Sequence, residues 1–524
     1  MISGPAHVVR LGRAGFIFAR EGVFGIVEPA ALPVSMRPLV RIARLVERRS
    51  TGTPETRLSA ALSRLGPSYV KLGQFLATRA DVVGTVLARD LERLQDRMPP
   101  FPQAEAEAVI AASFGRPVSA VFESFGPPVA AASIAQVHRA TIATATGPRA
   151  VAVKVLRPGV ESRFHADLSA FTFAAKHAEN ISAEARRLRL IEVVDTLRRS
   201  VMVEMDFRLE AAALSEMAEN TKDDPDFRVP EVDWDRTTKE VLTQEWIDGT
   251  PLSDRAQLLA KGFDLRQLAR ALIQTFLRHA LRDGFFHADM HPGNLFVDDA
   301  GRLVAVDFGI MGRLGAKERL FLAEILYGFI ARDYLRVARV HFEAGYVPPQ
   351  HSVEEFAQAI RAIGEPIHNR AAEDISMARL LTLLFEVTGL FDMRTRPELL
   401  LLQKTMVVVE GVARSMDPRL DIWSTAEPVV GEWMTRNLGP AGKLEGAAQG
   451  IGEIGRFLGN VPELLTQGTQ VLERLDEITR EGLLLLSPQT LAEIKRDETR
   501  LTRWTVGALW VIAALLAWLI ISRF

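Results

Sequence analysis

The stretch 285–309, FFHADMHPGNLFVDDAGRLVAVDFG, constrains the fold of this chain more than any other segment. Within it, Asp289 and Asn294 have the separation of the aspartate and asparagine in the kinase H-R-D-x-x-x-x-N loop, and His287 stands at the start of that loop. Asp307 opens a D-F-G triplet, the metal-binding motif of kinases. A lone D-F-G is weak evidence, but the two motifs together predict a phosphoryl-transfer site.

The chemistry of phosphoryl transfer explains these residue types. The triphosphate of ATP is highly charged, so Mg²⁺ ions must be held against it by a carboxylate and an amide. We therefore predict that Asp307 and Asn294 hold the metal and that Asp289 faces the attacking hydroxyl or water. Leu295–Val297 and Arg302–Val306 are predicted strands joined by a turn. This hairpin would bring the two predicted metal ligands to the same end of a sheet.

Hydrophobic patterns place a small sheet before a helical lobe. Leucines at helical spacing predict helices within 55–115, and a second helical region covers about 160–220. Strands are predicted at Val118–Phe125, Ala135–Thr141, Val151–Leu156 and Glu240–Ile247. Helices resume from 265, and after the 295–307 hairpin the chain is predicted to be almost wholly helical to 500. This order is that of a bilobal α+β fold of the protein-kinase type.

Five regions follow from these patterns. They are an N-terminal helical extension (1–115), a kinase-like N-lobe with a helical insert (116–250), a kinase-like C-lobe (251–420), a helical C-terminal region (421–503) and a transmembrane helix (504–521).

The predicted transmembrane helix rests on the segment Trp504–Ile521. It contains no charged residue and approaches the roughly 20 residues that a membrane-spanning helix needs. Basic residues precede it, at Lys495, Arg496, Arg500 and Arg503. The positive-inside rule then predicts that the large N-terminal part lies in the cytoplasm. A buried core helix is the alternative interpretation.

Composition excludes several classes of protein. The 524 residues can bury a large core, and their formal net charge of −2 argues against a nucleic-acid binder driven by bulk charge. The chain contains no cysteine, which excludes a disulfide framework, a thiolate metal site and a cysteine nucleophile. The basic and aromatic N-terminal segment is compatible with a membrane-surface helix or with a helix packed on the domain.

A lysine strand and a phosphate loop are expected upstream of a kinase-type catalytic loop. Val151–Lys154 has the form of the V-A-I-K strand, whose lysine pairs the α/β-phosphates and a helix glutamate. The glycine-rich phosphate loop aligns with the segment Ala130-Ala131-Ala132-Ser133-Ile134-Ala135, here called the alanine loop, which has alanine at every glycine position. An alanine Cβ obstructs the approach of backbone N–H groups to phosphates. The loop is therefore predicted to hold a nucleotide differently.

Three acids in the segment EMDFRLE are candidate partners for Lys154. Asp206 and Glu210 are four residues apart, so on a helix they share a face and repel unless a cation is near. Glu210 is predicted to pair with Lys154, which leaves Glu204 and Asp206 needing another cation. A solvated acidic face is equally compatible with this spacing.

These motifs together resemble those of the UbiB family of atypical kinase-like proteins, bacterial relatives of the mitochondrial coenzyme Q kinase-like proteins. The resemblance covers about residues 20–420. Lys71-Leu72-Gly73-Gln74 looks like the KxGQ motif of the family, whose N-terminal extension folds over the active site. Glu204-Met205-Asp206 looks like the ExD motif that the KxGQ lysine and glutamine engage. Because Lys71 and Gln74 share a helix face, one helix could present both to these acids as a regulatory lid.

The resemblance implies that further residues belong to the site. Ala130–Ala132 match the Ala-rich loop of the family, Lys154 and Glu210 its lysine–glutamate pair, and Asp289, Asn294 and Asp307 its catalytic and metal residues. Ala135 departs from the glycine frequent at that position. Glu245, near the end of a predicted strand, is also assigned to nucleotide binding.

The sequence lacks parts that a protein kinase uses to hold a peptide. Ala288 replaces the catalytic-loop arginine, and no A-P-E segment follows the D-F-G triplet. The resemblance implies instead a membrane-anchored atypical kinase or ATPase that uses Mg-ATP and supports ubiquinone biosynthesis. A small-molecule kinase of the aminoglycoside-phosphotransferase type and an ATP-gated, non-catalytic scaffold are the alternatives.

The implied location is the bacterial inner membrane, with a single span and the catalytic domain in the cytoplasm. The implied partners are membrane lipids, polyprenyl quinone precursors and ubiquinone biosynthesis proteins, with no nucleic acid. A homodimer is left open, as is the identity of the phosphoryl acceptor among lipid, protein and water.

Overall fold

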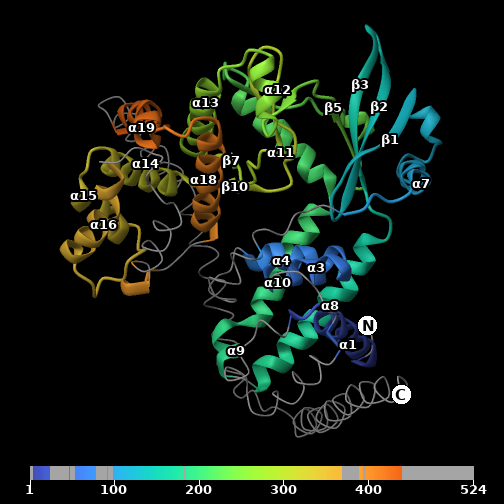
Figure 1. Ribbon diagram of the computed structural model, residues 1–524, viewed down its shortest axis with the longest axis horizontal. Coiled ribbons are helices and arrows are strands. Elements are labelled where there is room, and N and C mark those ends of the chain that lie inside the picture. The colour runs from blue at the N-terminus through green and yellow to red at the C-terminus, as the bar shows by residue number, and fades with distance from the viewer. Residues whose placement is uncertain are drawn as a thin grey trace, which may run out of the picture. The chain divides into compact units, whose positions relative to one another are not determined.

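The computed structural model describes residues 4–23, 46–47, 54–77, 91, 98–181, 183–368, 387, 389–393 and 397–438. The chain divides into two compact units. One is Phe18–Thr435, and the other combines Met1–Ile17 with Arg436–Phe524. All of the candidate site residues lie in the larger unit, whose elements are labelled in Figure 1.

A four-stranded antiparallel sheet forms the first lobe of the larger unit, in the order β1-β2-β3-β5. Its strands are β1 (Ser124–Ala131), β2 (Ala135–Thr144), β3 (Gly147–Leu156) and β5 (Val241–Glu245). Alternation along β3 buries Val151, Val153 and Val155 in a core shared with helix α7 (Gln103–Phe114). Lys154 therefore lies on the opposite face of the sheet.

The predicted strand Val118–Phe125 is wrong over most of its length. A 3₁₀ turn, η4 (Val118–Ala120), occupies its start, and β1 begins only at Ser124. Val121 and Phe122 are both buried although they are neighbours, an arrangement that the alternation of a strand cannot provide. The other predicted strands of this sheet are confirmed, with small shifts of their ends.

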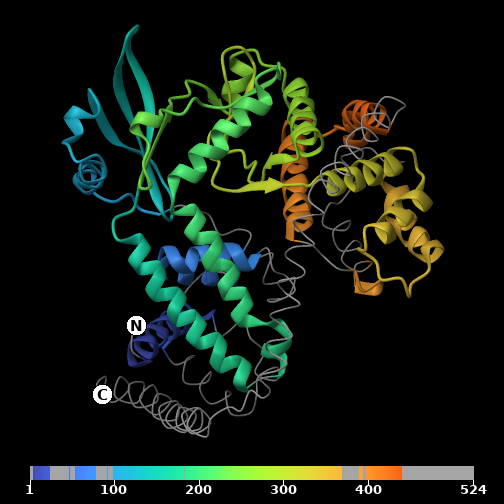
Figure 2. The ribbon, with the colours of Figure 1, turned by 180° about the vertical axis from the view of Figure 1, so that it is seen from behind.

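Helices fill the region between the strands β3 and β5, as predicted. They are α8 (Val160–Ile181), α9 (Ala183–Leu188), α10 (Leu190–Glu204) and α11 (Phe207–Thr221). Helix α10 packs along α8, and helix α4 (Pro67–Ala77), which follows α3 (Pro54–Leu65), contacts both of them (Figures 1 and 2). The N-terminal extension is thus attached to the helical insert of the N-lobe.

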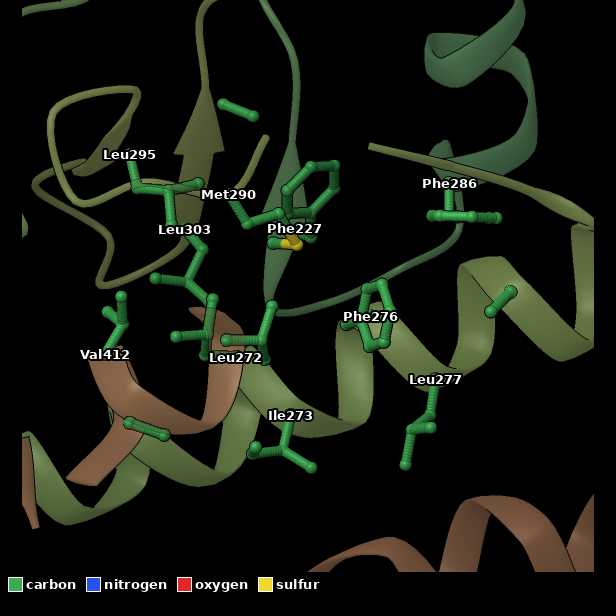
Figure 3. Packing of buried hydrophobic residues seen from close by; sticks show 14 of the residues in the cluster. Phe227, Leu272, Ile273, Phe276, Leu277, Phe286, Met290, Leu295, Leu303 and Val412 are labelled. Carbon is green, nitrogen blue, oxygen red and sulfur yellow. The ribbon is translucent and has the colours of Figure 1, made fainter. Parts of the chain in front are cut away.

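The second lobe is built around helix α13 (Leu265–Arg278). Its apolar residues recur at helical spacing, and Leu272 and Phe276 point toward Phe227 and Leu303 in one core (Figure 3). Burying each such side chain contributes about 1.5–3 kcal/mol relative to leaving it exposed. This core fixes the short strands next to the candidate site residues.

Those strands form two small sheets. One has the order β4-β9-β8-β6 and the other pairs β10 with β7. The strands are β4 (Phe227–Arg228), β6 (Thr250–Pro251), β7 (Phe285–His287), β8 (Leu295–Val297), β9 (Leu303–Ala305) and β10 (Met311–Arg313). The predicted hairpin is therefore confirmed as β8 and β9.

Two expectations for this lobe need correction. Its first helix is α12 (Arg255–Ala260), ahead of the predicted start at 265. The strand β10 also interrupts the stretch after the hairpin, where almost only helices were expected. Asp254 explains the earlier helix, because its side chain accepts a hydrogen bond from the backbone N–H of Gln257 and so caps α12.

The remaining helices complete the described part of the chain. They are α1 (Gly4–Arg20), α14 (Ala316–Ile330), α15 (Tyr334–Glu343), α16 (Val353–His368), α18 (Pro397–Met416) and α19 (Ile422–Leu438), with a 3₁₀ turn η5 (Trp234–Arg236) and a π turn η6 (His279–Asp283). The helical pattern predicted from Lys317 is confirmed by α14.

Within the described ranges no helix has the length and apolar character that a membrane span requires. The segment predicted to cross the bilayer, 504–521, lies outside those ranges.

Gly312 provides a direct test of how β7 and β10 pack. It pairs with Phe286, which is fully buried, and a Cβ at this position would overlap the Phe286 ring. We expect Gly312→Ala to lower the free energy of unfolding by about 1–3 kcal/mol, because the ring must move within a packed core. Thermal unfolding of the purified chain, followed by circular dichroism, measures this.

Gly411→Ala is the matched control. Gly411 lies within α18, and a Cβ there would meet no atom within 4 Å. Alanine is the better helix former, so the control should leave the unfolding temperature unchanged or raise it. Equal unfolding temperatures for the two variants would contradict the described pairing.

Candidate phosphoryl-transfer site

The hairpin β8–β9 brings the two predicted metal ligands together. Leu295 pairs with Ala305, and the N–H of Val306 donates to the carbonyl of Asn294 at 3.1 Å. Asn294 comes just before Leu295 and Asp307 comes two residues after Ala305, so both stand at the same end of the hairpin. The sequence prediction of their proximity is confirmed.

His287 joins the segment Asp289–Asn294, here called the catalytic loop, to the triplet Asp307–Gly309, here called the metal loop. Its Nδ1 accepts a hydrogen bond from the N–H of Asp289 at 3.0 Å, and its Nε2–H donates to the carbonyl of Asp307 through a short bond. A ring that accepts at one nitrogen and donates at the other is neutral. Burial lowers the pKa of His287, which agrees with this state. The sequence placed His287 in the motif but offered no sign of this bridging role.

Asp289 orients the side chain of Asn294. Its Nδ2 donates to the Asp289 carbonyl and to Asp289 Oδ2, both at 3.2 Å. The loop between them is closed by the N–H of His291, which donates to the Asp289 carbonyl at 2.8 Å. These bonds commit the amide nitrogen of Asn294 to Asp289, and the amide oxygen is the atom predicted to bind the metal.

Lys154 lies between two carboxylates. Its Nζ is 2.9 Å from both carboxylate oxygens of Glu210 and 3.3 Å from Oδ1 of Asp307. The Phe207 ring centroid is 5.4 Å from the same Nζ. The N–H of Phe308 also donates to Glu210 at 3.3 Å. The predicted Lys154–Glu210 ion pair is therefore present, and it extends to the metal loop.

The charges of this cluster support one another. Burial would raise the pKa of Asp307, but the Lys154 ammonium and the hydrogen bond from the Gly309 N–H together outweigh burial and hold that pKa well below its usual range. Burial would lower the pKa of Lys154, but Asp307 and Glu210 raise it well above its usual range. Lysine and aspartate are thus both charged near neutral pH, the states needed to bind phosphate and metal.

The donor set fits a magnesium ion held against a nucleotide. Among the residues that the structure describes, no group of three or more His, Cys, Asp or Glu side chains is arranged to hold a metal ion. Mg²⁺ characteristically takes one or two carboxylates from the protein and completes its shell with waters and substrate phosphates. The ionised carboxylate of Asp307 and the amide oxygen of Asn294 match that requirement.

The alanine loop is a tight turn between two strands. Ala130 and Ala131 end β1, Ala135 begins β2, and the N–H of Ala132 donates to the Ala135 carbonyl at 2.8 Å. Ser133 and Ile134, at the tip of the turn, are buried. Its predicted contact with phosphates stays a prediction.

The predicted lid contact is present for one of its two acids. Lys71 Nζ, on α4, is 2.6 Å from Glu204 Oε2, and both side chains are nearly buried. Asp206 instead caps α11 and pairs with Arg208 at 2.6 Å. The hydrogen bond from Arg208 lowers the pKa of Asp206. Gln74 lies on α4 as expected, and its contact with the acids stays a prediction.

The expectation that Asp206 and Glu210 share a helix face is therefore wrong. Helix α11 begins at Phe207, so Asp206 has extended backbone and sits outside the helix as its cap. An aspartate at this position satisfies a backbone N–H that the first helical turn leaves without a partner. The cation that Asp206 needs is its neighbour Arg208.

Glu245 has a structural partner that the sequence did not reveal. It ends β5, and its carboxylate accepts hydrogen bonds from Arg228 at 2.9 and 3.1 Å. Arg228 also donates to Asp298, in the turn of the β8–β9 hairpin, at 3.2 Å. Glu245 thereby ties β5 to the catalytic hairpin, and its nucleotide contact stays a prediction. No sequence signal marked Arg228, whose partners are distant along the chain.

The chain has a small antiparallel sheet whose Lys154 pairs with Glu210 of α11, followed by a helical lobe that contains the β8–β9 hairpin. This arrangement defines a kinase-like protein. Residues 93–341 match the ABC1 atypical kinase-like domain, and residues 360–421 match the UbiB helical domain. A Marinobacter nauticus protein named "Probable protein kinase UbiB" is 40% identical over 443 residues, which are 83% of this chain and 80% of that relative. The chain belongs to the UbiB family of atypical kinase-like proteins.

A solved structure supports the fold. It is that of a Mycobacterium tuberculosis protein in complex with erythromycin, with a TM-score of 0.52 and 26% sequence identity. The likeness covers 71% of this chain and 95% of that one.

We expect the Lys71–Glu204 ion pair to hold α4 against α10. Removing one partner of a nearly buried pair leaves an uncompensated charge, at a cost of roughly 1–3 kcal/mol at this partial exposure. Lys71→Glu should therefore loosen α4 from α10 and speed hydrogen exchange of the α4 amides. Adding Glu204→Lys to that variant should restore much of the protection.

Glu192→Gln is the control, because Glu192 lies on the same helix α10 and its exposed side chain pairs with Arg189 at 3.4 Å. Exchange in α4 that is unchanged by Lys71→Glu would show that the ion pair does not hold the helix.

Proposed function

We propose that this chain is a membrane-anchored atypical kinase or ATPase that binds Mg-ATP and supports ubiquinone biosynthesis. One observation carries the proposal: Lys154 joins Glu210 of α11 to Asp307 of the metal loop, with all distances at 3.3 Å or less. A kinase-type site must assemble this lysine–glutamate pair beside its metal aspartate before it can act. Membership of the UbiB family supports the ubiquinone assignment.

Each residue has a role in this proposal. Lys154 would bind the α/β-phosphates, and Asp307 with Asn294 would hold Mg²⁺. The metal would neutralise charge on the phosphates. Asp289 would accept the proton of the attacking hydroxyl or water, with its backbone held by His287.

Two features favour lipid precursors or a biosynthetic complex over general protein substrates. Ala288 stands where a protein kinase has the arginine that reads a phosphorylated loop, and no A-P-E segment follows. The helix α4, held by Lys71–Glu204, also belongs to an extension that an ordinary kinase lacks. The acceptor in this proposal is a lipid precursor, a biosynthetic protein or water.

The membrane tether in the proposal is the apolar segment 504–521. Polyprenylated precursors partition into the bilayer, so a tethered enzyme meets them at a higher effective concentration. The basic residues before the segment favour a cytoplasmic catalytic domain.

Asp307→Asn tests the proposal in cells. In a bacterial strain that lacks its own copy of this gene, the variant should fail to restore ubiquinone although the protein reaches the membrane fraction. Loss of a carboxylate from a metal site removes several kcal/mol of electrostatic stabilisation of the bound ion. Ubiquinone content, measured by chromatography of lipid extracts, is the readout.

Asp299→Asn is the matched control. Asp299 lies in the β8–β9 turn with its side chain 82% exposed, and it should restore ubiquinone fully. Purified protein adds a second readout, since Mg-ATP should raise the unfolding temperature of the control and not that of Asp307→Asn. Full restoration by Asp307→Asn would favour a scaffold, whereas a deletion strain with normal ubiquinone would refute the pathway.

A further inference from the structure

Helix α18 buries one stripe of side chains in the core of the second lobe. The members recur at spacings of three and four residues, which places them on one face of the helix. They are Leu402, Thr405, Val409, Val412, Ala413 and Met416. The apolar members share this core with Met290 of the catalytic loop, and Figure 3 shows Val412 and Met290 within it. Thr405 is the polar member of the stripe and is 1% exposed, so its hydroxyl needs a hydrogen-bond partner.

The Thr405 hydroxyl has two acceptors. Its Oγ1 lies 2.8 Å from the Leu401 carbonyl, one turn earlier in α18, and 3.0 Å from the Ala288 carbonyl. Because a hydroxyl carries one proton, the two carbonyls share it. A threonine bond to the carbonyl one turn earlier slightly destabilises a helix, so α18 does not need the first contact. The second contact joins α18 to a residue 117 positions away in the chain, directly before the catalytic loop.

The contact falls on the peptide plane that joins Ala288 to Asp289. The Ala288 carbonyl and the Asp289 N–H belong to this one planar unit. Thr405 donates to the carbonyl, and His287 Nδ1 accepts from the N–H at 3.0 Å. Both polar groups of the plane are therefore bonded, which prevents the plane from turning. A rotation of this plane would move the Asp289 side chain.

Ala288 itself offers no other polar anchor. Its side chain is a methyl group, and its own N–H donates to the Ile310 carbonyl at 3.0 Å, next to the metal loop. The residue is buried, so a carbonyl that lost the hydroxyl would be left without a partner rather than solvated. The loop would then have to shift to satisfy it.

We propose that Thr405 is a positioning residue that fixes the peptide before Asp289, so that the UbiB helical domain takes part in phosphoryl transfer. Helix α18 lies within the residues that match this domain, 360–421. The inference rests on the proposed function, in which Asp289 accepts the proton of the attacking hydroxyl or water. Mg-ATP binding is assigned to other residues, among them Lys154 and Asp307, whose contacts do not involve α18. Loss of the Thr405 hydroxyl therefore slows turnover without weakening nucleotide binding.

Thr405→Val tests this role because it keeps the shape of the side chain and removes the hydroxyl. Steady-state release of phosphate from Mg-ATP is measured on the full-length chain in liposomes. We expect kcat to fall about tenfold and KM for Mg-ATP to change less than about twofold, because a displaced Asp289 affects the reacting atoms and not the bound phosphates. Thr405→Ala also lacks the hydroxyl and takes the place of Thr405→Val if that variant does not fold.

Thr405→Ser separates the hydroxyl from the packing. It keeps the donor and removes a buried methyl group, so it should lower the unfolding temperature. Its kcat should nevertheless stay within about twofold of that of the unaltered chain. A role in packing alone predicts the reverse order of activities, because Thr405→Val fills the core better than Thr405→Ser does.

Thr425→Val is the matched control. Thr425 is a buried threonine of the next helix, α19, and its Oγ1 donates to the Asp421 carbonyl, one turn earlier, at 2.7 Å. This bond is the counterpart of the one between Thr405 and Leu401. Its loss should leave both kcat and KM unchanged.

The outcomes separate the two proposals. If the unaltered chain shows no Mg²⁺-dependent hydrolysis of ATP, the proposed function fails and the role of Thr405 fails with it. If the unaltered chain hydrolyses ATP and Thr405→Val turns over at the same rate, the positioning role alone is overturned. It is overturned as well if Thr405→Ser is as slow as Thr405→Val, or if Thr405→Val changes KM and leaves kcat unaltered.

Discussion

The rest of the site depends on one interaction, the ion pairs that the Lys154 ammonium makes with Glu210 and Asp307. The three residues come from a strand, a helix and a loop that are far apart in the chain. Two carboxylates this close repel each other unless a cation lies between them. The lysine therefore fixes where α11 and the metal loop stand relative to the sheet, and the Phe308 N–H strengthens this by binding Glu210.

The junction between α10 and α11, just before Glu210, connects the Lys154 ion pairs to the N-terminal extension. Glu204 ends α10 and binds Lys71, Asp206 caps α11, and Glu210 stands one turn into α11. A change in how α4 is held would therefore act close to the start of the helix that presents Glu210. On the other side of the sheet, Arg157 leaves the same strand as Lys154 and holds the alanine loop. Residues on β3 and just after it thus contact Glu210, Asp307 and the alanine loop.

The sequence was most informative where chemistry depends on local spacing. The strand-like runs Leu295–Val297 and Arg302–Val306 predicted a hairpin, because a strand pair with a short turn can be paired in few registers. The Lys154–Glu210 pair needed the family resemblance as well, since spacing alone left a solvated acidic face open. Other features depend on tertiary packing and were missed. Val121 and Phe122 are buried against α7 as neighbours, and the contacts of Arg157 with Pro99 and Ala132 join residues whose sequence separation predicts no interaction.

ATP hydrolysis by the purified full-length chain, in liposomes and in detergent, tests the central claim most directly. We expect Mg²⁺-dependent release of phosphate that is faster in liposomes and falls by at least about a hundredfold when Lys154 is replaced by alanine. Liposomes supply the surface at which the proposed tether would act. Phosphate release that is equal for the unaltered chain and the Lys154 variant, or that does not need Mg²⁺, would contradict the account.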